Sequence, residues 1–118
     1  FCYPRITGES LEFVAVSMLE DLAPSAWNPN IREPQIRDET IVAPSAMDLI
    51  LVPGLAFTRD GCRLGRGGGF YDRLLAARAP HTLALGICFD LQIVAALPTE
   101  PHDQRVDAVI TESGLLPR

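Results

Sequence analysis

Three short apolar runs constrain the fold of this chain most. They are MDLILVPGLAF at 47–57, TLALGICF at 82–89 and VDAVIT at 106–111. Each run is mainly apolar instead of alternating with polar residues, which is typical of strands buried on both faces of a sheet. Between the first two runs, apolar residues recur at helical spacing over 69–79. A second short helix is predicted from Asp90 to Pro98.

The resulting order of strand, helix, strand, helix, strand predicts an α/β fold. We expect a three-layer, Rossmann-like open sheet that is mostly parallel and has helices on both faces. Right-handed crossovers place the carboxyl ends of parallel strands along one edge, where the loop over 54–72 would also lie. Ligands of open α/β sheets bind at that edge. The segment 54–72 is therefore the first candidate for a functional site.

The first third of the chain is less regular. Residues 1–6 and 11–16 are expected to form short strands, and Pro4 suits the first of them to a sheet edge. The stretch 24–44 carries four prolines and little periodicity, which predicts a long extended loop. A length of 118 residues suits a single domain over 1–118.

Composition narrows the function classes. The net charge of −5 argues against a general nucleic-acid binder, because a polyanionic partner demands a basic face. No apolar run approaches the about 20 residues of a membrane-spanning helix. The three cysteines are widely spaced without a CxxC pair, which favours reduced thiols over disulfides or a zinc site. We therefore expect a soluble, cytoplasmic protein.

The strongest local signal is the stretch RLGRGGGFYD at 63–72. Glycines let a backbone approach a ligand closely, and free amides at a helix start concentrate positive dipole on an anion. Arg63 and Arg66 add mobile positive charge. The loop is therefore predicted to cradle phosphate, against the alternative of an ordinary flexible turn.

The common phosphate-loop motifs do not fit this stretch. Counted from Gly65, the sixth position of a dinucleotide fingerprint is Phe70 instead of glycine. A Walker A loop needs lysine, and all ten basic residues of this chain are arginines. Any anion site here must use planar guanidinium groups.

Acidic residues near the loop suggest a cation. Asp72 lies in the first predicted helical turn, where an acid is favoured simply by the helix dipole. Beside a polyphosphate, a carboxylate is also a hard oxygen ligand for Mg²⁺. A second ligand could come from Asp103 or Asp107, for which solvated loop acids are the alternative interpretation.

The block DLILVPGLAFTRDGCRLGRGGGFYDRLLA resembles the signature of the 5-formyltetrahydrofolate cyclo-ligase family, also called 5,10-methenyltetrahydrofolate synthetase. The segments PRI, WNPNIREPQ and HDQRVDAVITE follow in the family's order. The resemblance covers essentially the whole chain, which looks like the C-terminal portion of such a domain.

The resemblance implies an ATP- and Mg²⁺-dependent cyclisation of 5-formyltetrahydrofolate to 5,10-methenyltetrahydrofolate, with release of ADP and phosphate. The activity is expected of the intact protein, and whether these 118 residues alone have it stays open. Two alternatives stay open: a catalytically silent nucleotide-binding module, and a relative that acts on another formyl or folate derivative.

The resemblance also implies roles for individual residues of this sequence that match positions of the family's motif. Arg66 is expected to be catalytic, and Asp72 and Asp103 to hold magnesium. Aromatic walls for the flat pterin are expected from Trp27, Phe70 and Tyr71. The nucleotide-phosphate loop would comprise Arg63, Leu64, Gly65, Arg66, Gly67, Gly68, Gly69, Phe70 and Tyr71.

Two departures from the family pattern matter. Many members carry a lysine where Gly68 stands, so Arg66 and Mg²⁺ would carry that charge here. The basic N-terminal helix and first strand-helix unit of the family have no counterpart in this sequence. We therefore expect exposed apolar surface where that unit would pack, which favours self-association.

Overall fold

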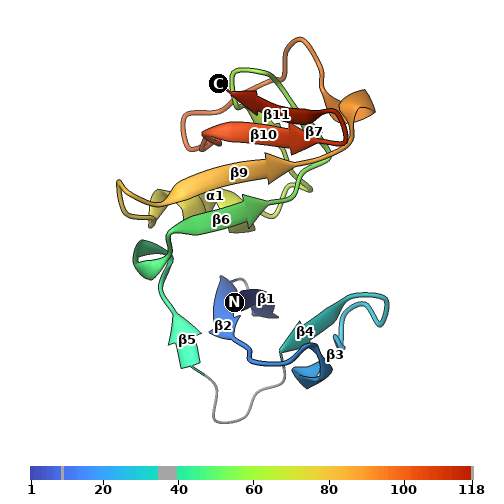
Figure 1. Cartoon of the computed structure of the whole chain (residues 1–118), viewed down its shortest axis with the longest axis vertical. Helices are drawn as coiled ribbons and strands as arrows, with labels where there is room; N and C mark the ends of the chain where they lie inside the picture. The colour runs from blue at the N-terminus through green and yellow to red at the C-terminus, as the bar shows by residue number, and fades with distance from the viewer. Residues whose placement is uncertain (9, 35–39, 118) are drawn as a thin grey trace. The chain divides into compact units, whose positions relative to one another are not determined.

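The structure is a computed structural model, and it describes residues 1–8, 10–34 and 40–117. The chain divides into two compact units, Phe1–Pro44 and Ser45–Arg118. Each unit is described by itself, and Figure 1 labels the helices and strands of both.

The first unit is built on an antiparallel sheet. Its strands β1 (Cys2–Thr7), β2 (Ser10–Ala15) and β5 (Thr40–Val42) lie in the order β1-β2-β5. The expected strands at 1–6 and 11–16 are confirmed, and β1 lies at the sheet edge as Pro4 predicted.

The prediction of a long extended loop over 24–44 was wrong in part, because β5 and two further short strands overlap this stretch. After the 3₁₀ turn η1 (Leu19–Asp21), β3 (Leu22–Pro24) pairs with β4 (Arg32–Pro34) as an antiparallel ribbon. The hydroxyl of Ser25 donates to the carbonyl of Asn28 at 2.6 Å and closes the turn between them. Prolines are tolerated because the ribbon has only two strands, both of them edges. Residues 35–39 of that prediction lie outside the described part.

The second unit carries the predicted sheet. Its parallel strands are β6 (Leu49–Val52), β9 (Leu83–Ile87) and β10 (Ala108–Thr111), and the sheet order is β11-β10-β9-β6. All three strands predicted from the apolar runs are therefore confirmed. The edge strand β11 (Gly114–Pro117) was not predicted; it turns back antiparallel on β10.

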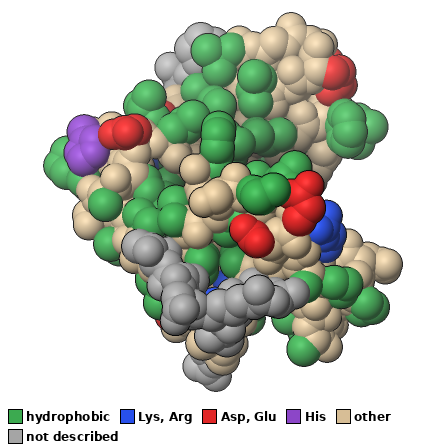
Figure 2. Space-filling model, turned by 60° about the horizontal axis from the view of Figure 1, so that its bottom comes forward, with side chains coloured by type: hydrophobic (Ala, Val, Ile, Leu, Met, Phe, Trp, Pro, Cys, Tyr) green, Lys and Arg blue, Asp and Glu red, His purple; other side chains and the backbone are tan. Residues whose placement is uncertain are grey.

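Burial on the two faces of this sheet is unequal, which corrects the expectation of strands buried on both faces. Ile50 and Val52 of β6 are buried, whereas Leu49 and Leu51 are 50% and 52% exposed. Strand register places Leu83 on the same face as Leu49. Hydrophobic side chains also gather on the face of the molecule shown in Figure 2. By strand register, Ile87 of β9 and Leu115 of β11 lie on the same sheet face as Leu83, and both are exposed.

One α-helix lies within the described residues of the second unit. Helix α1 (Phe70–Ala76) buries Leu74 and Leu75, and Figure 1 shows it behind β6 and β9. The second helix predicted from Asp90 to Pro98 was wrong, because only the 3₁₀ turn η3 (Asp90–Gln92) forms there. Helices on both faces are thus not seen in the part of the chain that the structure describes, although an α/β fold is. A further 3₁₀ turn, η2 (Pro44–Ala46), precedes β6.

A two-stranded ribbon joins β6 to the glycine-rich loop. Strands β7 (Ala56–Phe57) and β8 (Arg63–Leu64) pair antiparallel. Phe57 is completely buried, and a Cβ at Gly86 of β9 would lie only 2.6 Å from Cε1 of its ring. The Phe57 ring therefore packs directly on the backbone of the central strand, and it fixes where the ribbon leaves the sheet.

We expect Gly86→Ala to lower the free energy of unfolding by about 1–3 kcal/mol, because the added methyl overpacks the Phe57 ring. Urea unfolding followed by circular dichroism measures this change. In a Phe57→Leu background the same substitution should cost less, since the ring that it meets is smaller. Strict additivity of the two changes would contradict the contact.

A hydrogen-bond network ties η3 to the turn after β10. The carboxylate of Asp90 accepts hydrogen bonds from the hydroxyls of Ser113 and Thr111. The Asp90 amide donates to the carboxylate of Glu112 at 2.9 Å. The hydrogen bond from Ser113, and then that from Thr111, lowers the pKa of Asp90 below its ordinary 3.8.

This lowered pKa predicts a pH-dependent contribution to stability. Because the folded protein favours the ionised carboxylate, Asp90 stabilises the fold above pH about 3.8, and this contribution disappears as the pH falls through its lower folded pKa. Asp90→Asn should therefore be less stable than the parent chain at pH 6, and the difference should shrink toward pH 3. Urea midpoints of both proteins across this range test it. A difference that stays constant with pH would contradict the assignment.

No helix of the described residues is long and apolar enough to cross a membrane. The cysteines Cys2, Cys62 and Cys88 are free thiols, as their spacing predicted.

Candidate functional site

The glycine-rich loop leads from β8 directly into α1. Gly67 has φ +94° and Gly69 has φ +68°, a backbone conformation that residues with a side chain rarely adopt. Around Gly67 a Cβ would meet nothing within 4 Å, so its backbone is open to a ligand. No side chain caps the first turn of α1, which begins after Gly69. The positive φ expected of loop glycines is therefore present at Gly67 and Gly69.

Arg63 does not supply mobile charge, contrary to our expectation. Its side chain is only 7% exposed and lies with Nη2 3.9 Å from the Asp72 carboxylate. Nη1 donates to the carbonyl of Pro53 at 3.0 Å, and the guanidinium lies against Gly65, where a Cβ would meet it at 2.8 Å. Arg63 thus acts as a brace beneath the loop, because burying its charge requires these partners.

Arg66 is exposed at the tip of the loop and makes no hydrogen bond or ion pair with the residues that the structure describes. Arg73, one turn into α1, instead donates to the carbonyl of Gly68 at 3.0 Å. The guanidinium of Arg73 also stacks 5.3 Å from the centre of the Phe70 ring. The two arginines therefore differ: Arg73 holds the loop, and Arg66 is available to a ligand.

Phe70 and Tyr71 are half-buried at the start of α1. The Arg63 guanidinium lies 5.6 Å from the centre of the Tyr71 ring. Burial raises the pKa of the Tyr71 phenol, and the positive charge of Arg63 opposes this shift. Tyr71 is therefore a neutral hydrogen-bonding group at physiological pH.

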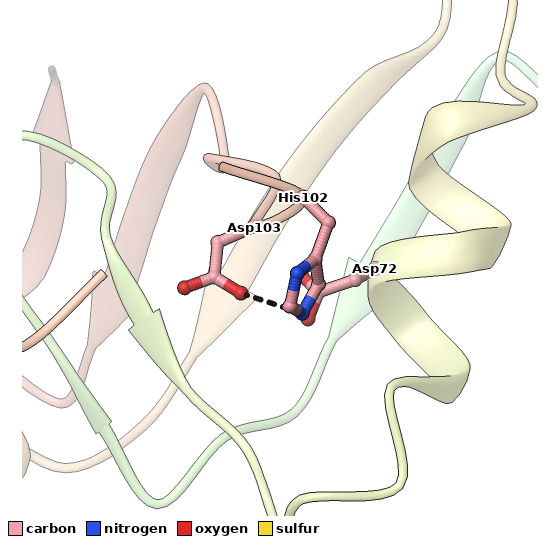
Figure 3. A group of neighbouring side chains, drawn as sticks. All are labelled: Asp72, His102 and Asp103. Carbon is pink, nitrogen blue, oxygen red and sulfur yellow. Dashed lines mark ion pairs between the residues drawn. The ribbon is translucent and has the colours of Figure 1, made fainter. Parts of the chain in front are cut away.

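Asp72 and Asp103 come together, as the sequence predicted for a pair of metal ligands. Figure 3 shows Asp72 extending from α1 toward the loop that carries His102 and Asp103. One ligand atom from each of the three residues lies within 4.8 Å of the others. Oxygen and imidazole donors at this separation could hold a divalent cation.

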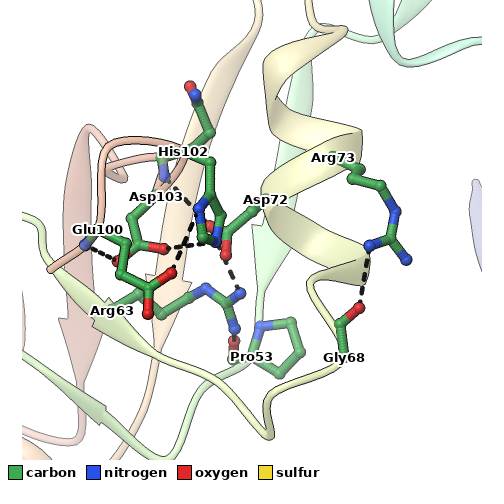
Figure 4. A network of polar contacts seen from close by, with 9 residues as sticks. Pro53, Arg63, Gly68, Asp72, Arg73, Glu100, His102 and Asp103 are labelled. Atoms are coloured by element: carbon green, nitrogen blue, oxygen red, sulfur yellow. Dashed lines mark hydrogen bonds and ion pairs between the residues drawn. The ribbon is translucent and has the colours of Figure 1, made fainter.

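Backbone hydrogen bonds hold the two carboxylates in place, and Figure 4 shows the surrounding network. The amide of Gln104 donates to Asp72 at 3.1 Å, and the amide of Glu100 donates to Asp103 at 2.7 Å. Asp107, the other acid considered, is elsewhere: it accepts from Arg78 at 2.9 Å and from the amide of Ala84 at 2.8 Å. Of the two candidate acids, Asp103 is therefore the one grouped with Asp72.

Two further predicted site residues, Leu64 and Trp27, lie outside the group formed by Asp72, His102 and Asp103. Leu64 is 40% exposed in β8. Trp27 belongs to the first unit, where it is 51% exposed and donates through its indole N–H to Glu33 at 3.1 Å. Its role as a pterin wall stays a prediction.

Sequence reasoning missed two residues of the cluster, His102 and Glu100. His102 ring nitrogens lie 3.4 Å from Oε2 of Glu100 and 3.4 Å from Oδ1 of Asp103. The signal was present in the sequence as an imidazole directly beside a candidate metal ligand, in TEPHD at 99–103.

The mouse and Escherichia coli K12 proteins named 5-formyltetrahydrofolate cyclo-ligase are similar to this chain. The mouse protein is 36% identical over 94% of this chain and 59% of its own length. The bacterial protein is 39% identical over 70% of this chain and 46% of its own length. The chain thus spans about half the length of these relatives.

Two solved structures have a similar fold. The Aquifex aeolicus 5,10-methenyltetrahydrofolate synthetase matches with a TM-score of 0.80 and 33% identity, over 98% of this chain and 57% of that one. The Mycoplasma pneumoniae protein of the same name matches in fold, with a TM-score of 0.68 at 23% identity, over 92% of this chain and 54% of that one. The model of the 5-formyltetrahydrofolate cyclo-ligase family matches residues 2–112. By sequence and by fold, this chain belongs to the 5-formyltetrahydrofolate cyclo-ligase family.

Proposed function

We propose that the protein carries out the ATP- and Mg²⁺-dependent cyclisation of 5-formyltetrahydrofolate to 5,10-methenyltetrahydrofolate, releasing ADP and phosphate. The observation that carries this proposal is the approach of Asp72 and Asp103 beside a glycine-rich loop whose tip arginine, Arg66, has no hydrogen-bond or ion-pair partner among the described residues. Family membership supplies the substrate class.

The loop suits the phosphates of ATP. Open backbone at Gly67 allows close approach of phosphate oxygens to the amides. Arg66 adds a planar cation that can hold two phosphate oxygens at once. The braced Arg63 keeps the loop in this shape and has its charge turned toward Asp72. We therefore assign the loop from 63 to 71 to the nucleotide, and Arg66 to the transferring phosphate.

The donor set of Asp72 and Asp103 fits Mg²⁺, which prefers carboxylate oxygens and commonly takes one or two of them together with substrate phosphates. When bound there, the ion would neutralise phosphate charge and orient the γ-phosphate. Asp72 and Asp103 would hold it.

The reaction requires two bond exchanges. The formyl oxygen of the folate forms a bond to the γ-phosphorus while the bond from that phosphorus to ADP breaks. The N10 lone pair then forms a bond to the formyl carbon, phosphate leaves with the former formyl oxygen, and N10 loses its proton. Positioning and charge stabilisation dominate such chemistry, so no protein nucleophile is required.

The flat pterin requires apolar surfaces on its faces. Phe70 and Tyr71 are the last residues of the phosphate loop and the first of α1, so a pterin beside them would be next to the γ-phosphate. We assign Phe70 and Tyr71 to the folate, and the role of Trp27 stays a prediction from the family resemblance.

The exposed sheet face around Leu51 and Leu83 supports two further parts of the proposal. In the intact protein a second helical layer would cover this face and complete the three-layer arrangement. While uncovered, the face favours self-association of the chain. A cytoplasmic location belongs to the same proposal and is supported by the free thiols.

Absorbance on mixing protein with 5-formyltetrahydrofolate, ATP and Mg²⁺ tests the function, because the methenyl product has a near-ultraviolet band. A signal from the full-length protein that requires all three components would support the proposal. Nucleotide binding without any signal would support the silent binding module, and turnover with another formyl donor alone would support a different substrate.

A further inference from the structure

We propose that His102 is a third protein ligand of the centre formed with Asp72 and Asp103, that Glu100 orients its ring, and that the centre consequently binds Zn²⁺ more tightly than Mg²⁺. This inference rests on the metal role of the two aspartates under the proposed function. It extends that role by assigning a nitrogen ligand and by naming a different cation that competes for the site.

The spacing of donor atoms suits a small cation. Nε2 of His102 lies 3.4 Å from Oδ1 of Asp103, which is long for a hydrogen bond. Ligands about 2.0–2.1 Å from a tetrahedral Zn²⁺ lie about 3.3 Å from one another. The Asp72 carboxylate, from a different element, completes a group of three within 4.8 Å. The His102–Asp103 separation is therefore close to the one that a shared zinc ion requires, and the Asp72 carboxylate lies near enough to join them.

Glu100 provides the partner that zinc-binding histidines usually have. Its Oε2 lies 3.4 Å from Nδ1 of His102, on the side of the ring opposite Nε2. In metal sites a carboxylate there accepts the Nδ1 proton, so that the lone pair of Nε2 faces the metal. The ring of His102 is thus flanked as a ligand would be, with a second carboxylate behind it (Figure 4).

The loop itself sets this geometry. The amide of Glu100 donates to Oδ2 of Asp103 at 2.7 Å, and the amide of Asp103 donates to the carbonyl of Glu100 at 3.0 Å. These two bonds close a tight turn over 100–103. Oδ2 of Asp103 is occupied by the turn, so Oδ1 is the oxygen that remains to face His102.

Exposure leaves room for further ligands. The Asp72 side chain is 17% exposed and that of Asp103 28%, whereas His102 is 64% exposed. An ion held by the three would lie at the surface, with open positions for water or phosphate, as in catalytic zinc sites. Imidazole favours Zn²⁺, while Mg²⁺ prefers oxygen. Zn²⁺ should therefore displace Mg²⁺ from the two aspartates and inhibit Mg²⁺-dependent turnover.

Isothermal titration of the metal-free protein with Zn²⁺ and with Mg²⁺ tests this inference without any substrate. We expect tighter binding of Zn²⁺ than of Mg²⁺. His102→Gln should weaken Zn²⁺ binding at least about tenfold, and Glu100→Gln by about 10–100-fold. The effect of His102→Gln on Mg²⁺ binding should be much smaller, because imidazole is a poor magnesium ligand.

The chain offers a matched control, because its second histidine, His81, is 60% exposed beside Asp48 at 3.9 Å. His81→Gln should leave Zn²⁺ binding unchanged, which also accounts for any Zn²⁺ held by the cysteines present in every variant. Circular dichroism checks that the variants fold. Unchanged Zn²⁺ affinity in both His102→Gln and Glu100→Gln would overturn the inference even if cyclo-ligase turnover is intact. The expected losses in a protein without turnover would support the metal centre and refute only the proposed function.

Discussion

Asp72→Asn in the full-length protein should lower Mg²⁺-dependent ATP turnover by on the order of 10²-fold or more, since a bound metal contributes several kcal/mol of charge stabilisation and each 1.36 kcal/mol is tenfold in rate. The thermal midpoint should also fall, because the buried Arg63 guanidinium loses the charge that lies 3.9 Å from it, although the asparagine carbonyl can still accept the amide of Gln104, as Asp72 does at 3.1 Å. A coupled assay of ADP release measures the loss of turnover, and titration with Mg²⁺ measures the loss of metal binding.

Asp48→Asn is the matched control for this change. The Asp48 side chain is 99% exposed and lies outside the cluster, so turnover should be that of the parent protein. If Asp72→Asn bound Mg²⁺ and turned over ATP as the parent does, its role as a metal ligand would be excluded.

Arg66→Ala should lower kcat by about 10²–10³-fold, which is the usual effect of removing one hydrogen-bond donor that stabilises the charge of a transition state. Its thermal midpoint should stay that of the parent, because the Arg66 side chain has no partner among the described residues. Arg66→Lys should recover part of the rate, since lysine restores the charge without the bidentate geometry. The near-ultraviolet product assay measures kcat, and a melting curve measures the thermal midpoint.

The other loop arginine gives the opposite pattern. Arg63→Ala should lower the stability of the protein more than its phosphate binding. The buried Arg63 donates a hydrogen bond to the Pro53 carbonyl and lies beside Asp72. Arg59→Ala, in the exposed turn between β7 and β8, should change neither readout strongly. An Arg66→Ala protein with normal kcat would remove Arg66 from the reaction.

Local patterns predicted most elements of the second unit. The runs at 47–57, 82–89 and 106–111 became β6, β9 and β10, and helical spacing predicted α1. The expected helix after Asp90 failed, because the carboxylate that was to cap it binds the hydroxyls of Ser113 and Thr111 instead. Those partners lie more than 20 residues away along the chain, so local propensity could not reveal them.

The sequence predicted a phosphate-binding loop, but it did not predict that the two loop arginines differ in their surroundings. The glycine spacing indicated a phosphate loop, and positive φ at Gly67 and Gly69 agrees with it. Sequence could not tell apart Arg63 and Arg66, since both are loop arginines with the same chemistry. Packing separates them: the Arg63 guanidinium is buried beneath Gly65, and that of Arg66 is exposed and meets no partner in the part of the chain that the structure describes.

The sequence by itself determined which chemistry is available: strands from apolar runs, a glycine loop from residues that tolerate positive φ, and guanidinium instead of ammonium because the chain has no lysine. These are properties of single residues and near neighbours. Only the tertiary structure decided that Asp103 and not Asp107 joins Asp72, and that His102 and Glu100 stand beside them. Such choices depend on atoms brought together from α1 and the loop before β10, about 30 residues apart, where a few ångströms decide which carboxylate meets a cation and which meets an arginine.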